Sequence, residues 1–345
     1  MTRYWMLSGL ICGLILTGCG AIQQSTRDGP PADGKYDSFY PGQNAGPQLE
    51  KAFESIQKIA VIVYYQQYQF YKKDKVTRAQ IRSGIFRDRI RETRPFHTSV
   101  VGTASILFHE DQRVALLTSA HVVDKPDTLM SYFAEKGKVR SQYIQTVSLR
   151  TRHNYLLAGY SALDDLEVLA IDQTRDLALV GMKLPGRVEY ALKPLSYPFG
   201  EARRLEWGSF VYLLGYPWGK RMVTAGLASP TASSQITYTI DAPFNQGMSG
   251  GIVLAIRDGW PNLEVVGLTN SASGKFEARL APPDTLSREH YSPDVPYGGE
   301  SYVRYSKQFA SGVTNVVSVD AIKEFLRENE GELRDQGYDL RGLYR

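Results

Sequence analysis

Cysteine is nearly absent from this sequence. Its two cysteines, Cys12 and Cys19, both lie within the first twenty of 345 residues. The rest of the chain therefore has no thiol for a disulfide, a zinc site or a cysteine nucleophile. Histidine is also scarce, with five residues, and no metal-ligand spacing links them. We expect neither a bound metal nor any other cofactor.

The sequence also lacks a strong charge of either sign. It has 40 Lys and Arg against 36 Asp and Glu, a net charge of +4. No basic stripe is interleaved with aromatic side chains, so we expect no nucleic-acid partner. The content of 43% hydrophobic and 22% charged residues is ordinary for a globular protein. The length allows one large domain or two smaller lobes with a real core.

An apolar run lies at the N-terminus, where Arg3 precedes residues 6–16. The run is too short to span a bilayer as a mature helix and is typical of a signal peptide. The four residues that end at Cys19, Leu-Thr-Gly-Cys, resemble a bacterial lipobox. We therefore expect a signal peptide over 1–18 and lipidation of Cys19, with an ordinary secretory signal as the alternative. Gly20 is not the aspartate that often retains lipoproteins at the inner membrane, which favours an anchor in the outer membrane of the bacterial cell envelope, facing the periplasm.

Residues 19–50 are rich in Gly, Pro, Asp, Ser and Gln. They have little apolar surface to bury, and we predict a flexible tether. About thirty such residues reach roughly 30 Å by random-coil scaling. That reach is enough to hold a domain clear of a lipid surface.

Beyond the tether the sequence consists mainly of short β-type runs separated by turn residues. No long amphipathic helix separates them, which indicates antiparallel barrels or sandwiches. The segment 193–208, which contains Pro and Gly, is the predicted seam between halves at about 55–190 and 205–320. The runs rich in Val, Ile, Tyr, Leu and Thr are 59–65, 100–108, 114–118, 129–133, 143–150, 166–171, 177–182, 210–214, 224–229, 235–240, 252–256, 265–269 and 314–319.

Three short segments carry the residue types of nucleophilic catalysis. His121 lies in Thr-Ser-Ala-His-Val-Val, Asp176 in Arg-Asp-Leu-Ala-Leu-Val, and Ser249 in Gly-Met-Ser-Gly-Gly. Their chain order is that of chymotrypsin-type hydrolases and not of subtilisins or α/β-hydrolases. A serine hydroxyl is a poor nucleophile at neutral pH unless a base lies within hydrogen-bond reach and a third group orients that base.

We predict Ser249 as the nucleophile, His121 as the base and Asp176 as the carboxylate that orients the imidazole. The backbone N–H groups of Gly247 and Ser249 are predicted to form the oxyanion hole, because a bulky residue at 247 would make their convergence difficult. Asp172 is the alternative acid. His97, His109, His153 and His290 lack comparable surroundings.

Together these segments resemble the trypsin-like serine peptidases, and in particular the HtrA/Deg branch. The resemblance also includes Gly-Tyr-Pro-Trp-Gly at 215–219, the small-residue strand at 102–105 and the closing segment at 316–326. It spans roughly residues 55–330, in family order. It implies an all-β fold of two six-stranded antiparallel β-barrels, with the catalytic cleft between them and a C-terminal helix.

We therefore expect a protease domain over 51–330 and a C-terminal tail over 331–345. In the helix, Ile322, Phe325 and Leu326 fit one face that packs on a barrel.

Several features depart from the family pattern. A basic segment at 70–97 follows the first strand; we expect a solvated loop or helix there, with anionic lipid or an acidic partner as the alternative. The polar segment 271–312 is longer than the family norm, and we expect a functional or disordered loop. Met248 replaces the polar residue common before the serine. No PDZ domain is expected, because too few residues remain.

The sequence gives the least information on substrate preference. Pro243 stands six residues before the nucleophile, where trypsin-like enzymes that cut after Lys or Arg carry an aspartate. Val266, Gly267 and Leu268 are expected to flank the specificity pocket, and they are apolar. We expect a small or medium aliphatic P1 side chain in a protein or peptide substrate.

We predict a membrane-anchored serine endopeptidase, and two other functions remain as alternatives. Residues 247–251 also satisfy the G-x-S-x-G motif of α/β-hydrolase esterases. That motif leads into a helix, whereas residues 252–256 look like a strand, and His290 is the only later histidine. The other alternative is a lipoprotein that uses a protease fold to bind a partner without turnover.

Overall fold

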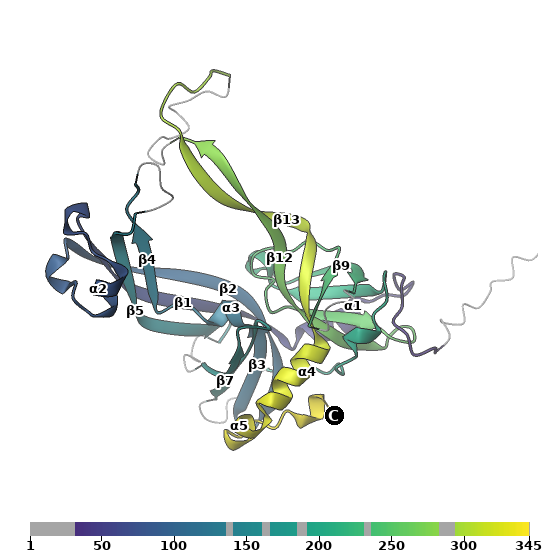
Figure 1. Cartoon of the computed structure of the whole chain (residues 1–345). Coiled ribbons are helices and arrows are strands. Elements are labelled where there is room, and N and C mark those ends of the chain that lie inside the picture. Colours follow the sequence, from purple (N-terminus) through teal and green to yellow (C-terminus); the bar gives the residue numbers. More distant parts are fainter. Residues whose placement is uncertain are drawn as a thin grey trace, which may run out of the picture.

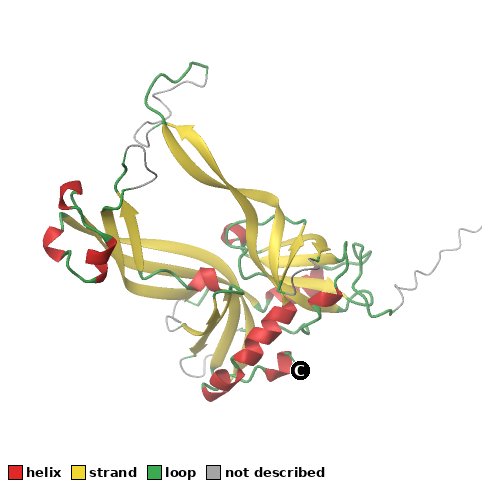
Figure 2. Ribbon diagram, in the orientation of Figure 1, coloured by secondary structure: helices red, strands yellow, loops and turns green. Residues whose placement is uncertain are grey.

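The chain folds into two β lobes followed by a C-terminal helix (Figures 1 and 2). The computed structural model describes residues 32–135, 141–160, 166–184, 192–230, 236–282 and 294–344. The predicted signal peptide, Cys19 and His290 lie outside these residues. The predicted all-β fold with a C-terminal helix is confirmed.

The first lobe is a curled antiparallel sheet of seven strands in the order β4-β5-β1-β2-β3-β7-β6. The sheet curls without closing into the six-stranded barrel that we expected. The reason lies in β4, which occupies the outer edge of β5 from Thr128 opposite Leu149 to Tyr132 opposite Ile144. The strands are β1 Ile56–Gln69, β2 Glu92–Glu110, β3 Arg113–Ser119, β4 Thr128–Tyr132, β5 Ile144–Leu157, β6 Glu167–Asp172 and β7 Leu177–Lys183.

The second lobe is a closed barrel of six strands in the order β10-β13-β12-β11-β8-β9, as expected. β11 is buried along its whole length, which explains why its sequence is apolar at every position and does not alternate. The strands are β8 Phe210–Gly215, β9 Met222–Ser229, β10 Thr237–Ile240, β11 Ile252–Ile256, β12 Leu263–Ala281 and β13 Tyr302–Ser318.

The helices are short except for the one that follows the second barrel. In that helix, α4, Ile322, Phe325 and Leu326 are buried as predicted, and the Ser318 hydroxyl caps its first turn by accepting the Ala321 N–H. No helix within the described ranges is long and apolar enough to cross a membrane. The α-helices are α1 Gly46–Phe53, α2 Arg78–Arg82, α3 Ala120–Val123, α4 Val319–Glu328 and α5 Glu330–Asp335, and the 3-10 turns are η1 Lys72–Asp74, η2 Arg87–Arg89, η3 Ala202–Arg204, η4 Pro217–Gly219 and η6 Arg341–Leu343.

The basic segment 70–97 covers the far end of the first lobe, where α2 lies in Figure 1. β1 ends at Gln69 opposite Glu92 of β2, so the segment forms the tip of the β1–β2 hairpin. A small apolar core joins this tip to the sheet; its buried members are Phe70, Val76, Ile81, Phe86, Ile144 and Val147. The segment is therefore an ordered platform.

The predicted long loop at 271–312 is largely a β-hairpin in its described part. β12 and β13 continue out of the barrel as a paired ribbon, from Ala272 opposite Thr314 to Ala281 opposite Tyr302 (Figure 1). Each strand extends directly from a barrel strand, with register shifts between Thr269 and Ser271 and between Ala272 and Gly274. Our expectation of a loop failed because it weighed the polar composition and ignored this continuity.

The last part of the predicted tether lies against the second barrel. Tyr36 is buried, its hydroxyl donates to Glu264 Oε2 at 2.7 Å, and it accepts the Glu201 N–H at 2.9 Å. The Asp37 N–H donates to the Ile256 carbonyl at 2.9 Å. In the described residues, the chain is therefore bound to the protein well before residue 50.

Candidate active site

The three predicted catalytic side chains come from both lobes. β3 ends at Ser119, and the following short helix α3 carries His121. Asp176 ends the turn between β6 and β7, and Ser249 lies just before β11. The first two residues belong to the first lobe and Ser249 to the second, so the site lies where the lobes meet.

The three side chains form a continuous line of hydrogen bonds. His121 Nδ1 lies 2.6 Å from Asp176 Oδ2, and His121 Nε2 lies 2.9 Å from Ser249 Oγ. The His121 backbone N–H donates to Asp176 Oδ1 at 2.8 Å. Since a carboxylate only accepts, Nδ1 carries the proton and Nε2 is the acceptor, as a general base requires. The ring is 45% exposed, whereas Ser249 is buried.

A tight turn brings Asp176 to His121. Asp176 has a φ of +56°, a conformation that aspartate tolerates better than most residues. Asp172 shapes this turn, because its Oδ1 accepts the N–H groups of Thr174 and Arg175 at 2.8 and 2.9 Å. Of the two candidate acids, Asp176 contacts the histidine and Asp172 holds the turn that presents it.

The turn around Ser249 depends on two glycines. Gly247 has a φ of +99°, and a Cβ there would lie 2.4 Å from the Tyr216 carbonyl oxygen. Gly250 has a φ of +85°, and a Cβ there would lie 2.0 Å from the Thr103 carbonyl oxygen. Within the described ranges, the N–H groups of Gly247 and Ser249 donate to no protein acceptor. These donors are the two predicted for the oxyanion hole.

Thr103 of β2 fastens this turn to the first lobe. Its side chain is fully buried, and Oγ1 donates to the Gly247 carbonyl at 2.8 Å while it accepts the Tyr216 N–H at 2.9 Å. Its N–H donates to the Ser249 carbonyl at 2.8 Å. The sequence marked residues 102–105 only as a small-residue strand. The available signal was a hydroxyl between small residues on a buried strand, which must find partners.

The Ser249 hydroxyl has a second acceptor that sequence reasoning missed. Its Oγ lies 3.1 Å from the carbonyl oxygen of Asn270 on β12. A serine has one proton to donate, so Asn270 competes with His121 for it in this state. A backbone carbonyl leaves no signal in the sequence.

Arg175, directly before the acid, ties the Asp176 turn to helix α4. Its guanidinium donates to both carboxylate oxygens of Glu328, at 2.6 and 2.8 Å, and lies 3.0 Å from Asp172 Oδ2. The hydrogen bond from Arg175 lowers the pKa of Glu328. This bidentate pair links the first lobe to the helix that follows the second.

The residues predicted to flank a specificity pocket are buried, and their contact with substrate stays a prediction. Val266 and Leu268 are fully buried in the barrel core, and a Cβ at Gly267 would lie 2.4 Å from Val316. This part of β12 is buried on both faces in the closed barrel, and that burial explains its apolar sequence. Pro243 is exposed, and its contact with substrate stays a prediction. Met248, which replaces the polar residue common before the serine, buries its side chain in the core.

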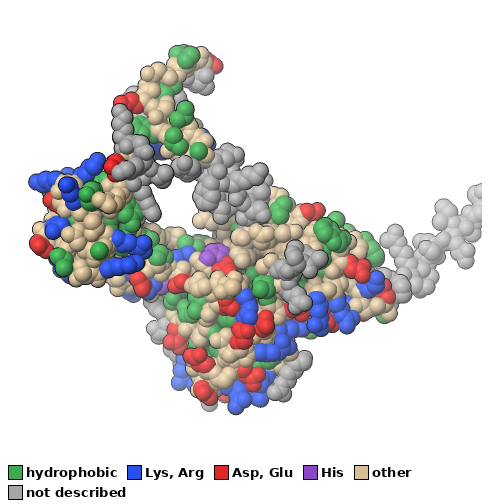
Figure 3. All heavy atoms as spheres, in the orientation of Figure 1, with side chains coloured by type: hydrophobic (Ala, Val, Ile, Leu, Met, Phe, Trp, Pro, Cys, Tyr) green, Lys and Arg blue, Asp and Glu red, His purple; other side chains and the backbone are tan. Residues whose placement is uncertain are grey.

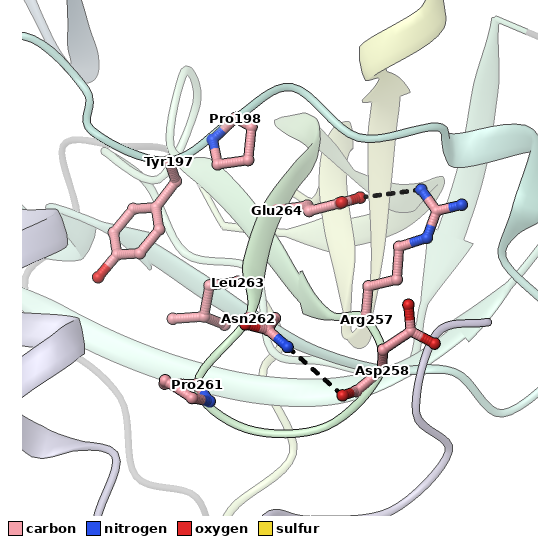
Figure 4. Close-up of a pocket in the computed structure, with 8 residues that line it drawn as sticks. All are labelled: Tyr197, Pro198, Arg257, Asp258, Pro261, Asn262, Leu263 and Glu264. Carbon is pink, nitrogen blue, oxygen red and sulfur yellow. Dashed lines mark hydrogen bonds and ion pairs between the residues drawn. The ribbon is translucent and has the colours of Figure 1, made fainter. Parts of the chain in front are cut away.

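A polar hollow of about 420 Å³ lies elsewhere on the second barrel (Figure 4). Figure 4 shows Arg257 directed at Glu264 and the Asn262 amide directed at the Asp258 backbone, which leaves these polar groups partnered by the protein. None of the three predicted catalytic residues lines it. The hollow is therefore separate from the candidate active site.

Comparison with known proteins gives a family match and a structural neighbour. Residues 102–268 match the family model described as trypsin-like peptidase domain, and the match includes His121, Asp176 and Ser249. This part of the chain is similar to trypsin-like peptidase domains. The chain is also similar to a solved thermostable serine protease, AL20, from an extremophilic microorganism, with 11% identity, a TM-score of 0.35, and coverage of 76% of this chain and 93% of that one. No curated protein matches the chain.

Removing the Thr103 hydroxyl should loosen the joint between the lobes. We expect Thr103→Val to lower the free energy of unfolding by about 1–3 kcal/mol, because the buried Gly247 carbonyl loses its donor. Urea denaturation checks this value. Thr103→Ser, which keeps the hydroxyl, is the matched control and should stay close to the parent chain. A valine variant as stable as the serine variant would show that the hydroxyl does not hold the turn.

The Arg175–Glu328 pair should make the stability of the folded protein depend on pH in the acidic range. The folded pKa of Glu328 lies below its ordinary value of 4.5, so its stabilisation is present above pH 4.5 and is lost as the pH falls through the lowered value. We expect Glu328→Gln to lower Tm at pH 7, with a difference from the parent chain that shrinks below pH 4.5. Glu332→Gln, on α5, is the control and should show no such trend. A Glu328→Gln difference that is constant from pH 7 to pH 3.5 would contradict this account.

Proposed function

We propose that this chain is a serine endopeptidase that hydrolyses peptide bonds, with Ser249 as nucleophile, His121 as base and Asp176 as the orienting carboxylate. The observation that carries the proposal is the hydrogen-bonded line from Asp176 through His121 to Ser249, at 2.6 and 2.9 Å, inside a trypsin-like peptidase domain. The protein or peptide substrate follows from the class of domain.

In the proposed reaction, Ser249 Oγ attacks the carbonyl carbon of the scissile peptide bond and its proton passes to His121 Nε2. Asp176 stabilises the imidazolium through the Nδ1–H bond. The oxyanion that forms accepts hydrogen bonds from the backbone N–H groups of Gly247 and Ser249. His121 then donates its proton to the leaving amine, and water hydrolyses the acyl-enzyme by the same steps.

A second candidate function, a binding module without turnover, is favoured by one observation. The Asn270 carbonyl lies 3.1 Å from Ser249 Oγ and offers the hydroxyl proton an acceptor other than His121. A hydroxyl held by Asn270 is not activated by the base. Substrate binding that displaces this hydrogen bond would separate a latent enzyme from a permanently silent one.

We further propose that the protein acts at a bacterial membrane as an HtrA-like lipoprotein. The lipobox-like residues that end at Cys19 support lipidation, and Gly20 favours the outer membrane with the domain in the periplasm. The motif strings at 118–123, 215–219 and 241–251 support the HtrA/Deg branch.

The experiment that tests the proposed chemistry is covalent labelling with a fluorophosphonate, which reacts with activated serines. We expect the full chain to gain one label between pH 6 and 9, and peptide mapping to place it on Ser249. Ser249→Ala should abolish labelling and His121→Ala should lower it at least about a hundredfold, because the hydroxyl loses its base.

Ser83→Ala, which removes an exposed serine far along the chain from the site, is the matched control and should label like the parent chain. Absence of labelling across that pH range, also in the presence of an unfolded protein substrate, would contradict the enzyme and favour the binding module.

A further inference from the structure

The far end of the first lobe, residues 70–97, concentrates positive charge that the proposed chemistry does not use. We call this segment the basic tip. It carries nine Lys and Arg against three carboxylates, whereas the whole chain has a net charge of only +4. The remainder of the chain is therefore slightly acidic. The cations are Lys72, Lys73, Lys75, Arg78, Arg82, Arg87, Arg89, Arg91 and Arg94.

These cations are presented to solvent. All except Arg89 are exposed, and in the described part of the chain Arg94 with Glu92 is the one ion pair that they form. Figure 3 shows Lys and Arg side chains gathered at the end of the molecule where α2 lies. A free cluster of like charges costs energy by mutual repulsion, so its concentration at one end indicates an anionic partner.

The basic tip is also preorganised. The Phe86 ring packs edge-on against Phe70 at 6.0 Å between ring centres, over the buried core that joins the tip to the sheet. Thr77 and Gln80 form a capping box at the start of α2. The cations are therefore carried by an ordered surface that pays little entropy on docking.

Two exposed apolar side chains among the cations distinguish a lipid surface from other anionic partners. Ile85 is 60% exposed and stands between Arg82 and Arg87 along the chain. Tyr71 is 47% exposed, with the Arg91 guanidinium over its ring at 4.9 Å. An aliphatic and an aromatic side chain flanked by cations match the boundary between acyl chains and anionic headgroups.

We propose that the basic tip docks on an anionic membrane surface, with the cations at the headgroups and Ile85 and Tyr71 at the acyl boundary. On β2, Glu92 lies opposite the last residue of β1, and Thr103 lies eleven residues further along, about 35 Å at ~3.3 Å per residue. Docking therefore leaves the candidate active site clear of the bilayer. This contact is independent of lipidation at Cys19 and of peptide hydrolysis.

The test is vesicle flotation of the full chain, with phosphatidylglycerol-containing vesicles compared with pure phosphatidylcholine. We expect stronger binding to the anionic vesicles, weakened by 0.5 M salt. Substituting Lys72, Lys75, Arg78 and Arg82 by Gln should reduce that preference at least about tenfold. Every variant keeps residues 6–16, so any contribution of that apolar run to vesicle binding is common to the parent chain and the variants.

The matched control removes four other exposed cations, by substituting Lys51, Lys183, Lys193 and Arg334 by Gln, and should keep the preference. Ile85→Ser, which leaves the charge unchanged, should weaken anionic-vesicle binding about fivefold. Thermal unfolding checks that each variant is folded.

Equal losses in the two fourfold variants, or no preference in the parent chain, would overturn the proposal. Soluble polyglutamate, run as a competitor, tests the other anionic partner. If it displaces the vesicles at equal charge concentration and Ile85→Ser has no effect, the basic tip binds acidic polypeptides and the membrane proposal is wrong.

Discussion

The candidate active site depends on one buried hydroxyl. His121 and Asp176 belong to the lobe whose sheet does not close, and Ser249 belongs to the lobe with the closed barrel. The 2.9 Å contact between His121 Nε2 and Ser249 Oγ joins the two lobes, so it forms only when the lobes are held in a fixed relative position. Thr103 contributes to that relative position at the site itself, because its side chain and backbone bond to the two residues on either side of Met248. Thr103 therefore couples the placement of Ser249, the shape of the turn at 247–250 and the packing of the two lobes.

Around this joint, the same groups serve both geometry and chemistry. The carbonyls of Gly247 and Ser249 are engaged by Thr103, while their N–H groups are left without protein acceptors in the described residues. Arg175 holds the neighbouring turn to α4 and so fixes the carboxylate that fixes the imidazole. The exception is Ser249 itself, whose hydroxyl has two acceptors. In the proposed mechanism, the Ser249 hydroxyl is activated only when bound substrate leaves His121, and not the Asn270 carbonyl, as its acceptor.

The sequence revealed the parts of this site that are side chains within local motifs, and missed the parts made by the fold. His121, Asp176 and Ser249 were found because each lies in a short recognisable string, and Asp176 was preferred over Asp172 by its apolar continuation. Thr103 was missed because its partner at Gly247 lies 144 residues away. The apolar strand at 265–268 suggested a pocket wall, since a buried strand and a pocket strand have the same composition. We expected the first barrel to close because the family pattern implies it. In the structure β4 pairs with the outer edge of β5, and the sheet stays open.

The most direct test of the central claim is a crystal structure of the chain after reaction with a phosphonate inhibitor. The account predicts phosphorus bonded to Ser249 Oγ, with a phosphonyl oxygen within hydrogen-bond distance of the N–H groups of Gly247 and Ser249. It also predicts that Thr103 Oγ1 still donates to the Gly247 carbonyl. A phosphonyl oxygen that points to solvent, with the Gly247 N–H turned away and the Thr103 bond broken, would contradict the account.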